Sequence, residues 1–327
     1  MKMSELGEFG LQERLAQIIP TGPGVVVGIG DDAAVFRADG LGLATTDSLV
    51  EGSHFSRAWA SAEELGWKAL AVNLSDIAAM GGVPRYALVS LALPGDTEVE
   101  WVLELYEGLV EAAQLYQVAI VGGDLHRAPE VSINVTVLGT AQGAYLLRSA
   151  ARPGDLVGVT GYLGSSAGGL RMLRQGLSLD AEASAYLRQA HLRPRPRIGE
   201  GQALLRLGVK AAIDISDGLV ADLGHLCRLS QVRARITTSY LPLHPLLKRA
   251  FPGQAIALAL TGGEDYELLF TAPHEAMLRA RKNLPVTVIG EVREGEGVEV
   301  VDERGQPFPL EREGWEHFAP GNRQPQP

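Results

Sequence analysis

Aspartates recur in short strings rich in Gly, Ser or Thr, and these strings are the part of the chain best suited to chemistry. The strings are residues 28–32, 45–48, 73–76, 122–124 and 214–218. Most follow an apolar run typical of a strand, which places the carboxylates at strand ends. Turns alone favour Asp and Gly, and that explanation would suffice for any single string. Five strings of one kind instead favour a cluster that binds hard cations such as Mg²⁺, because gathered carboxylates repel one another unless a cation neutralises them.

Asp76 gives the sharpest of these predictions. It falls within a mainly apolar predicted helix, with Asn73 one turn earlier on the same face. A buried carboxylate without a partner is costly or becomes protonated. We therefore expect Asp76 to hold a metal; a structural bond to a backbone amide or an Arg is the alternative.

Two neighbouring strings offer further oxygen ligands. Thr45, Thr46 and Asp47 end a predicted strand, and their hydroxyl and carboxylate oxygens could complete the shell of a Mg²⁺ ion, although a turn cap would use the same residues. Asp31 and Asp32 are adjacent, and two neighbouring negative charges are costly without a cation nearby. We therefore expect one to point inward and the other to cap the turn.

Three motifs leave their alternatives open. Residues 161–169 follow a predicted strand and open a helix, so their backbone N–H groups could approach an anion, or their glycines could serve close packing. This string is neither the dinucleotide fingerprint nor a Walker A loop. His54 is either a ligand contact or a packed loop residue. Trp315, in a Gly-Trp-Glu-His-Phe segment, is either a packing anchor or a stacking platform for a flat ring.

The composition is that of a folded protein with many tight turns. The chain has 327 residues, 46% of them hydrophobic and 39 of them glycine, and this length suggests two domains. A net charge of −10 argues against nucleic acid or an anionic membrane as the main partner. A single cysteine, Cys227, fits a reducing cytosol. No apolar leader or membrane-spanning run is visible, so we expect a cytoplasmic location.

Strands and helices alternate along the chain, which indicates an α/β or α+β fold. A helix is predicted over 65–80, opened by a capping box of Ser61 and Glu64, and a second over 97–116. Strands are predicted over 25–29, 43–45, 86–93, 118–121 and 131–139, then over 156–160, 211–215, 256–260, 267–271 and 286–289. Further helices are predicted up to about 207 and over 219–229.

A polar stretch marked by Pro and Gly at 148–155 is the predicted domain boundary. It separates an N-terminal domain, 1–147, from a C-terminal α/β domain, 148–320. Residues 321–327 are rich in Pro and Gln and are predicted to be a disordered tail.

Taken together, the strings resemble the thiamine-monophosphate kinase family, within the superfamily that includes aminoimidazole ribonucleotide synthetase. The resemblance begins with Gly-Glu-Phe at 7–9 and covers nearly the whole chain. Its main motifs are Gly-Asp-Asp-Ala-Ala at 30–34, Thr-Thr-Asp at 45–47, Asn-Leu-Ser-Asp-Ile-Ala-Ala-Met-Gly-Gly at 73–82, Gly-Gly-Asp at 122–124, Asp-Ile-Ser-Asp-Gly-Leu at 214–219, Gly-Gly-Glu-Asp-Tyr-Glu-Leu at 262–268 and Gly-Trp-Glu-His-Phe at 314–318.

The resemblance implies ATP-dependent phosphorylation of thiamine monophosphate to thiamine diphosphate, by direct transfer of the γ-phosphoryl group with several Mg²⁺ ions. The implied metal ligands are Asp31, Thr45, Thr46, Asp47, Asp76, Asp124, Asp214 and Asp217. Those taken as catalytic are Asp31, Asp47, Asp76, Asp124 and Asp217. The implied ATP contacts are Tyr106, Gly123, Asp124, Arg148 and Ser216. The implied contacts to thiamine monophosphate are His54, Glu264 and Trp315.

The resemblance also implies a two-domain synthetase-like fold in a homodimer, in which the N-terminal domain, 1–147, binds ATP and metal and forms the dimer contact. The N-terminal domains of two subunits would pair their sheets into a shared β-barrel, and the C-terminal domain would be an α/β layered unit. Selenophosphate synthetases generally carry a Cys or selenocysteine in an early Gly-rich segment and hydrogenase-maturation members end in a functional Cys, and this chain has neither. Three alternatives remain: an aminoimidazole ribonucleotide synthetase-like enzyme, a metal-dependent phosphohydrolase that activates water, or a non-catalytic nucleotide- or cation-binding regulator.

Overall fold

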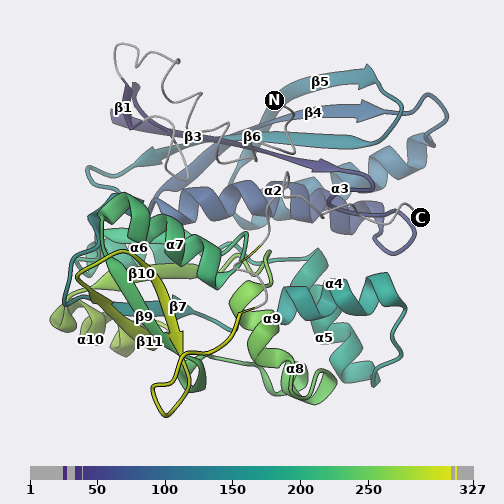
Figure 1. Cartoon of the computed structure of the whole chain (residues 1–327). Coiled ribbons are helices and arrows are strands. Elements are labelled where there is room, and N and C mark those ends of the chain that lie inside the picture. Colours follow the sequence, from purple (N-terminus) through teal and green to yellow (C-terminus); the bar gives the residue numbers. More distant parts are fainter. Residues whose placement is uncertain (1–24, 28–33, 39, 311–313, 315–327) are drawn as a thin grey trace, which may run out of the picture. The chain divides into compact units, whose positions relative to one another are not determined.

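The computed structural model describes residues 25–27, 34–38, 40–310 and 314. The chain divides into two compact units (Figure 1). Among the described residues, the first unit comprises those up to Ile77 together with Val83–Gly143, and the second comprises Ala78–Gly82 together with those from Ala144 to Gly314. The predicted disordered tail, 321–327, lies outside the described residues.

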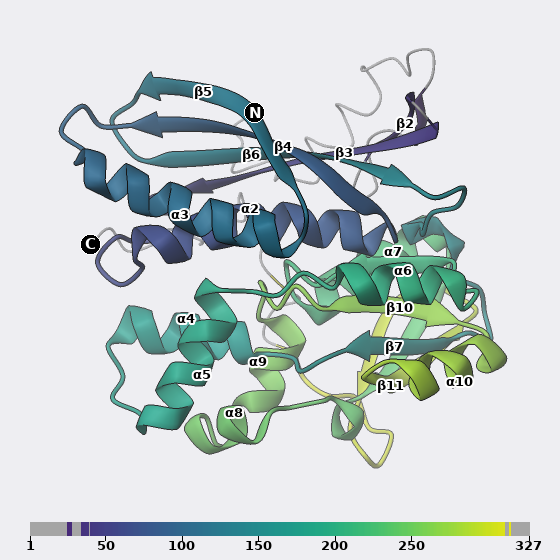
Figure 2. The same ribbon diagram turned by 180° about the vertical axis from the view of Figure 1, so that it is seen from behind.

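The first unit is a six-stranded sheet with two helices along one face (Figure 2). Its strands are β1 (Val25–Val27), β2 (Ala34–Ala38), β3 (Gly40–Val50), β4 (Val83–Leu93), β5 (Ala119–Arg127) and β6 (Ser132–Ala141), in the order β1-β2-β3-β6-β4-β5. The helices are α2 (Ala62–Ala79) and α3 (Val99–Leu115). Only β4 and β5 pair in parallel, because α3 is the crossover between them.

The sequence of the first unit accounts for this layering. Along β6, buried residues alternate with half-buried ones, as expected of a sheet packed on one face. The predicted capping box is confirmed: the Ser61 N–H donates to Glu64 Oε2 at 2.9 Å, and the Glu64 N–H donates to Ser61 Oγ at 3.2 Å. Helices α2 and α3 pack so closely that a Cβ on Gly66 would lie 1.9 Å from the Leu105 carbonyl oxygen.

The second unit is also built on a six-stranded sheet, in the order β12-β9-β11-β7-β10-β8. Its strands are β7 (Leu156–Thr160), β8 (Ala211–Asp214), β9 (Arg233–Thr237), β10 (Leu268–Ala272), β11 (Val286–Arg293) and β12 (Gly297–Val301). Its helices are α4 (Ser165–Gln175), α5 (Ala181–Leu192), α6 (Ile198–Arg206), α7 (Leu219–Ser230), α8 (Pro245–Ala250), α9 (Ala255–Thr261) and α10 (His274–Asn283), with short 3-10 turns η1 (Arg148–Ala150) and η2 (Thr238–Tyr240).

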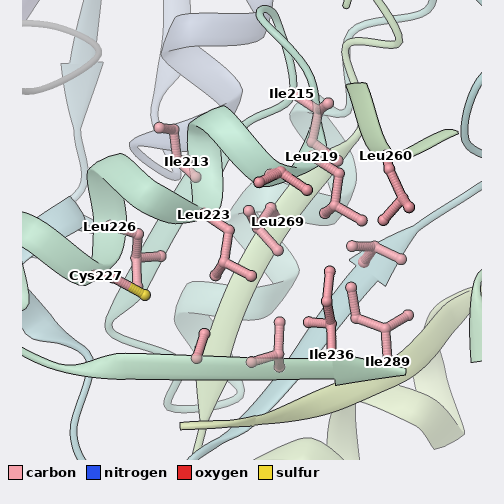
Figure 3. Packing of buried hydrophobic residues seen from close by; sticks show 14 of the residues in the cluster. Ile213, Ile215, Leu219, Leu223, Leu226, Cys227, Ile236, Leu260, Leu269 and Ile289 are labelled. Carbon is pink, nitrogen blue, oxygen red and sulfur yellow. The ribbon is translucent and has the colours of Figure 1, made fainter. Parts of the chain in front are cut away.

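A large apolar core fixes the start of α7 against this sheet (Figure 3). Ile215 precedes a short loop and Leu219 follows it, and both side chains are fully buried in that core. The loop between them, residues 216–218, is therefore held at both ends by hydrophobic burial.

The prediction of a strand over 256–260 is wrong, because this segment lies in helix α9. A short apolar run cannot be assigned by periodicity alone, and Ala and Leu are among the strongest helix formers. In α9 the buried residues Ala255 and Ala259 are four apart, which is the helical spacing. The apolar pattern did not indicate β2, β9, β12, α8 or α10 as separate elements.

Candidate functional site

Thr45 and Asp76 form a close pair in the first unit. The Thr45 hydroxyl donates to Asp76 Oδ2 at 2.5 Å. Thr45 lies opposite Val137 of β6, whose side chain is fully buried, so Thr45 points to the helix-covered face of the sheet. Asp47 lies two residues further along β3 and belongs to the same face; its Oδ1 accepts the Ser48 N–H at 2.8 Å. This face therefore presents hydroxyl and carboxylate oxygens, the ligands that hard cations prefer.

Two other predicted ligands of the first unit are not brought to this pair. Thr46 lies on the opposite face of β3 from Thr45, where its Oγ1 is 2.9 Å from Thr136 Oγ1. Asp124 lies on β5, and β6 and β4 lie between β5 and β3. At ordinary strand spacing, the distance from β3 to β5 is about 14 Å. The Asp124 carboxylate is exposed, with Oδ2 at 3.1 Å from His126 Nδ1.

The remaining predicted residues of this unit are held by their own local structure. His54 Nδ1 accepts the Val50 N–H at 3.1 Å, so the neutral ring carries its proton on Nε2. Tyr106 is half-buried on α3, and burial raises the pKa of its hydroxyl. Gly123 lies so close to β4 that a Cβ there would be 1.7 Å from the Val89 carbonyl oxygen.

In the second unit, the loop before α7 wraps around a carboxylate of that same helix. Asp222 Oδ2 accepts the backbone N–H groups of Ser216, Asp217 and Gly218, each at 3.1 Å. Both Asp222 and Asp214 are only 2% exposed. Three predicted site residues, Asp214, Ser216 and Asp217, are thus gathered at one end of β8.

This loop is a concentration of negative charge. Burial raises the pKa of Asp222 well above its ordinary value, and the charges of Asp217 and Asp214 raise it further, while Arg148 opposes them. Burial lowers the pKa of His225 to about 4, and nearby arginine charge adds to that effect. Ligand atoms of Asp217, Asp222 and His225 lie within 4.8 Å of one another. The predicted residue Arg148 therefore acts electrostatically on the same cluster.

A second loop, between α9 and β10, is bonded directly to the first. The Glu264 N–H donates to the Ser216 carbonyl at 2.7 Å, and the Tyr266 N–H donates to the Ile215 carbonyl at 2.9 Å. Glu264 has a φ of 64°, which is unusual for a residue with a side chain. Its Oε2 lies 3.3 Å from Nδ1 of the buried His191. The predicted Glu264 is thus held in one orientation beside the predicted Ser216.

The Gly-rich string before α4 also surrounds a carboxylate of the protein. Asp265 accepts the Gly164 N–H at 2.6 Å and the Ser166 N–H at 3.2 Å. Burial raises the pKa of Asp265 to about 8, the two N–H bonds lower it, and the charges of Glu267 and Glu264 raise it. The group bonded to the N-terminus of this helix is therefore a carboxyl group of the protein itself.

Comparison with known proteins gives the family. The AIR synthase related protein family matches through its N-terminal domain over residues 30–141 and its C-terminal domain over residues 152–303. The thiamine-monophosphate kinase of Aquifex aeolicus (strain VF5) is 40% identical over 322 residues, covering 97% of this chain and 100% of that relative. The one from Bacillus subtilis (strain 168) is 41% identical over 310 residues, covering 90% and 94%.

The chain belongs to the thiamine-monophosphate kinase family. The solved structure of AaThiL complexed with AMPPCP and TMP is similar, with a TM-score of 0.88 and 40% identity over 97% of this chain and 99% of that one. The two-domain α/β fold expected from the sequence is thereby confirmed.

Two predicted site residues of this thiamine-monophosphate kinase family member, Asp31 and Trp315, lie outside the described residues. Gly314, which directly precedes Trp315, is described. A Cβ on Gly314 would lie 2.5 Å from the Ala221 Cβ and 2.9 Å from the Asp217 carbonyl oxygen. The chain just before Trp315 therefore lies against the first turn of α7.

Three charged or titratable residues were not predicted from the sequence. Asp222 and His191 contact predicted site residues, and Asp265 accepts from the 161–169 string. The first had a readable signal, because Asp222 is one helical turn after Gly218, where a carboxylate can reach back to N–H groups at a helix start. Asp265 and His191 had none, because their partners are far away in the sequence.

Proposed function

We propose that this member of the thiamine-monophosphate kinase family transfers the γ-phosphoryl group of ATP to the phosphate of thiamine monophosphate, giving ADP and thiamine diphosphate. The observation that carries the proposal is 40% identity along 97% of the chain to a thiamine-monophosphate kinase. The similarity to AaThiL complexed with AMPPCP and TMP supports the same pair of substrates.

We further propose that Mg²⁺ is the metal and that each unit contributes oxygen-rich residues that bind Mg²⁺ ions. The donor chemistry fits, because the Thr45–Asp76 pair and the Asp214–Asp217 loop offer only hydroxyl and carboxylate oxygens. The charges that raise the pKa of Asp222 are the kind of repulsion that a divalent cation relieves. When bound, Mg²⁺ neutralises phosphate charge and fixes the phosphates in position.

The protein's own part in such a transfer is positioning and charge neutralisation, because phosphoryl transfer needs no protein nucleophile. Arg148 supplies positive charge beside the α7 loop. The other proposed ATP contacts are Ser216, Tyr106, Gly123 and Asp124. On the acceptor side, Glu264 would pair with the cationic thiazolium or accept from the aminopyrimidine.

Two further residues would complete the acceptor contacts. His54 carries its neutral-state proton on Nε2 because Nδ1 accepts from Val50, so Nε2 would donate to the acceptor phosphate. Trp315 would stack on a flat ring of the substrate.

We also propose a homodimer. Among the described strands, β5 pairs only with β4 and forms one edge of its sheet, and an unpaired edge is a template for another strand. Its Val121 and Leu125 side chains are 56% and 64% exposed, which favours burial against a second subunit. Gly123 and Asp124 lie on the same strand, so pairing there would bring both residues to the subunit interface.

The expected partners and location remain those of a small-molecule enzyme. No helix within the described ranges is long and apolar enough to cross a membrane. The net charge of −10 disfavours nucleic acid and anionic lipid. We propose a cytoplasmic location with ATP and thiamine monophosphate as the molecules bound.

The proposed function is tested by incubating the protein with ATP, Mg²⁺ and thiamine monophosphate and separating the thiamine phosphates by chromatography. A kinase forms thiamine diphosphate and ADP in equal amounts and only when both substrates are present. A phosphohydrolase would release inorganic phosphate without the acceptor, and a regulator would turn over nothing. Either of these two results would exclude the proposed activity.

A further inference from the structure

We infer that Asp222 is a positioning residue that holds the Ser216–Gly218 loop so that it presents oxygen ligands to a cation instead of N–H groups to a phosphate. The inference rests on the proposed function, in which Asp214 and Asp217 are metal ligands and Ser216 contacts ATP. It assigns a role to a residue that neither the sequence strings nor the family resemblance singled out.

The backbone of this loop has the form of an anion-binding site. It lies between the end of β8 and the start of α7, and three consecutive N–H groups point to one place. Such N–H groups at a helix N-terminus commonly bind phosphate. Here all three donate to Asp222 Oδ2 at 3.1 Å, so the anion that they bind is the protein's own carboxylate.

The rest of the loop is fixed by its neighbours. Ile215 and Leu219 anchor its two ends in the apolar core (Figure 3). The Ser216 carbonyl accepts the Glu264 N–H at 2.7 Å. With the ends buried and the N–H groups turned inward to Asp222, a ligand of this loop would meet oxygen atoms instead of N–H groups, and oxygens suit a cation.

Asp222 itself is poorly placed to coordinate a cation directly. Its side chain is buried, at 2% exposure, and one of its oxygens already accepts three hydrogen bonds. Its neighbour Asp217 is half-buried and lies nearer to solvent. Asp222 therefore acts through the loop that it holds.

Two substitutions separate this role from the others. Asp222→Asn and Asp222→Ala both remove the negative charge, but only Asn keeps an oxygen that can accept from the loop. If Asp222 acts through its charge or as a metal ligand, the two variants are equally impaired. If it acts by positioning, only the Ala variant is strongly impaired.

The first measurement is amide hydrogen exchange of the metal-free protein, which needs no turnover. We expect Asp222→Ala to speed exchange of the Ser216, Asp217 and Gly218 amides about tenfold or more, since three hydrogen bonds are lost. Asp222→Asn should keep most of the protection. The matched control is Asp155→Ala, since Asp155 is another buried carboxylate of this unit, 6% exposed, and accepts the Arg152 N–H at 3.0 Å. It should leave exchange in the loop unchanged.

The second measurement is the Mg²⁺ dependence of turnover with saturating ATP. We expect Asp222→Ala to lower kcat about tenfold or more and to raise the Mg²⁺ concentration at half-saturation, because ligands displaced by a fraction of an ångström lose much of their effect. Asp222→Asn should stay within a few-fold of the wild type. Should Asp222→Ala not fold, Asp222→Ser replaces it, because a serine hydroxyl is too short to reach three N–H groups.

Equal loss in the Asn and Ala variants would overturn the inference, and so would unchanged loop exchange in Asp222→Ala. Faster loop exchange in the Asp155→Ala control would overturn it as well, by showing a general loss of stability. Failure of the proposed function looks different: the wild type would form no thiamine diphosphate, while the exchange measurement would still decide the role of Asp222.

Discussion

The ion pair between Arg197 and Glu267 is predicted to be among the most important polar contacts of the second unit. The Glu267 side chain is 7% exposed and that of Arg197 is 22% exposed. Glu267 accepts the Thr160 hydroxyl at 2.6 Å and Arg197 Nε at 2.6 Å, and it also accepts Arg197 Nη2. Burial lowers the pKa of Arg197, but the hydrogen bonds and charge of Glu267 outweigh it and leave the pKa raised.

Arg197→Ala would leave the Glu267 carboxylate buried with Thr160 as its main remaining donor. Breaking such a pair by removing one partner typically costs about 3–5 kcal/mol of unfolding free energy. For a unit of this size that corresponds to a fall in Tm of roughly 6–20 °C. The carboxylate also lies against Gly161, where a Cβ would be 2.0 Å from Glu267 Oε1, so the strand-to-helix turn before α4 should loosen too.

The assay is equilibrium urea unfolding with thermal scans of the wild type and of Arg197→Ala. The matched control is Arg249→Ala, which removes an exposed arginine paired with Asp180 and Glu182 at 2.8 Å and 2.9 Å; its Tm should stay close to the wild type. Replacing both Arg197 and Glu267 by Met should recover much of the loss, because no unpaired charge remains. A Tm for Arg197→Ala equal to that of the control would refute the reasoning, since the Glu267 carboxylate would then be solvated without its partner.

Three further outcomes are expected. The pKa of Asp265 is raised to about 8, so the stability that its neutral form contributes is present at low pH and is lost as the pH rises from its ordinary pKa toward 8. Relative to Asp265→Asn, the wild-type unfolding free energy should fall between pH 5 and 8 by at most about 1.4 kcal/mol per pH unit. Parallel pH profiles of the two proteins would contradict this. Asp76→Asn, which alters the partner of Thr45, should lower kcat roughly a thousandfold with an unchanged circular dichroism spectrum; near-normal turnover at saturating Mg²⁺ would exclude a metal-ligand role. Trp315→Ala should raise KM for thiamine monophosphate several-fold, from about 1 kcal/mol of lost stacking, and leave KM for ATP unchanged; a parallel rise in both KM values would make Trp315 a structural anchor.

Local signals predicted the local structure well. The capping box at Ser61 and Glu64 opens α2, and the strand and helix on either side of residues 216–218 are where the apolar pattern placed them. The strand prediction for 256–260 failed because five apolar residues fit a buried strand and a helix equally. Only its packing against the core decides for the helix, and packing is a property of the whole unit.

The sequence names candidate site residues but not the partners that the structure gives them. Thr45 and Thr46 are adjacent and chemically alike, yet the pleat of β3 turns one toward Asp76 and the other toward Thr136. Successive side chains of a strand point to opposite faces of the sheet, which separates the two residues. The bond from Gly164 to Asp265 joins residues 101 positions apart, and no local pattern contains that information.

The two loops that look most suited to phosphate share one arrangement. Each lies between a strand and a helix, before α4 and before α7, and in each the N–H groups are occupied by a carboxylate of the protein, Asp265 or Asp222. At these two helices the N-terminal N–H groups are therefore already bonded to a carboxyl group of the protein, and a nucleotide would meet oxygen atoms there instead of free N–H groups. Oxygen ligands repel phosphate unless a cation lies between them. Within the second unit, the neutralisation of nucleotide charge near α7 then depends on bound cations and on Arg148, which is the chemical reason for expecting activity to require a divalent metal.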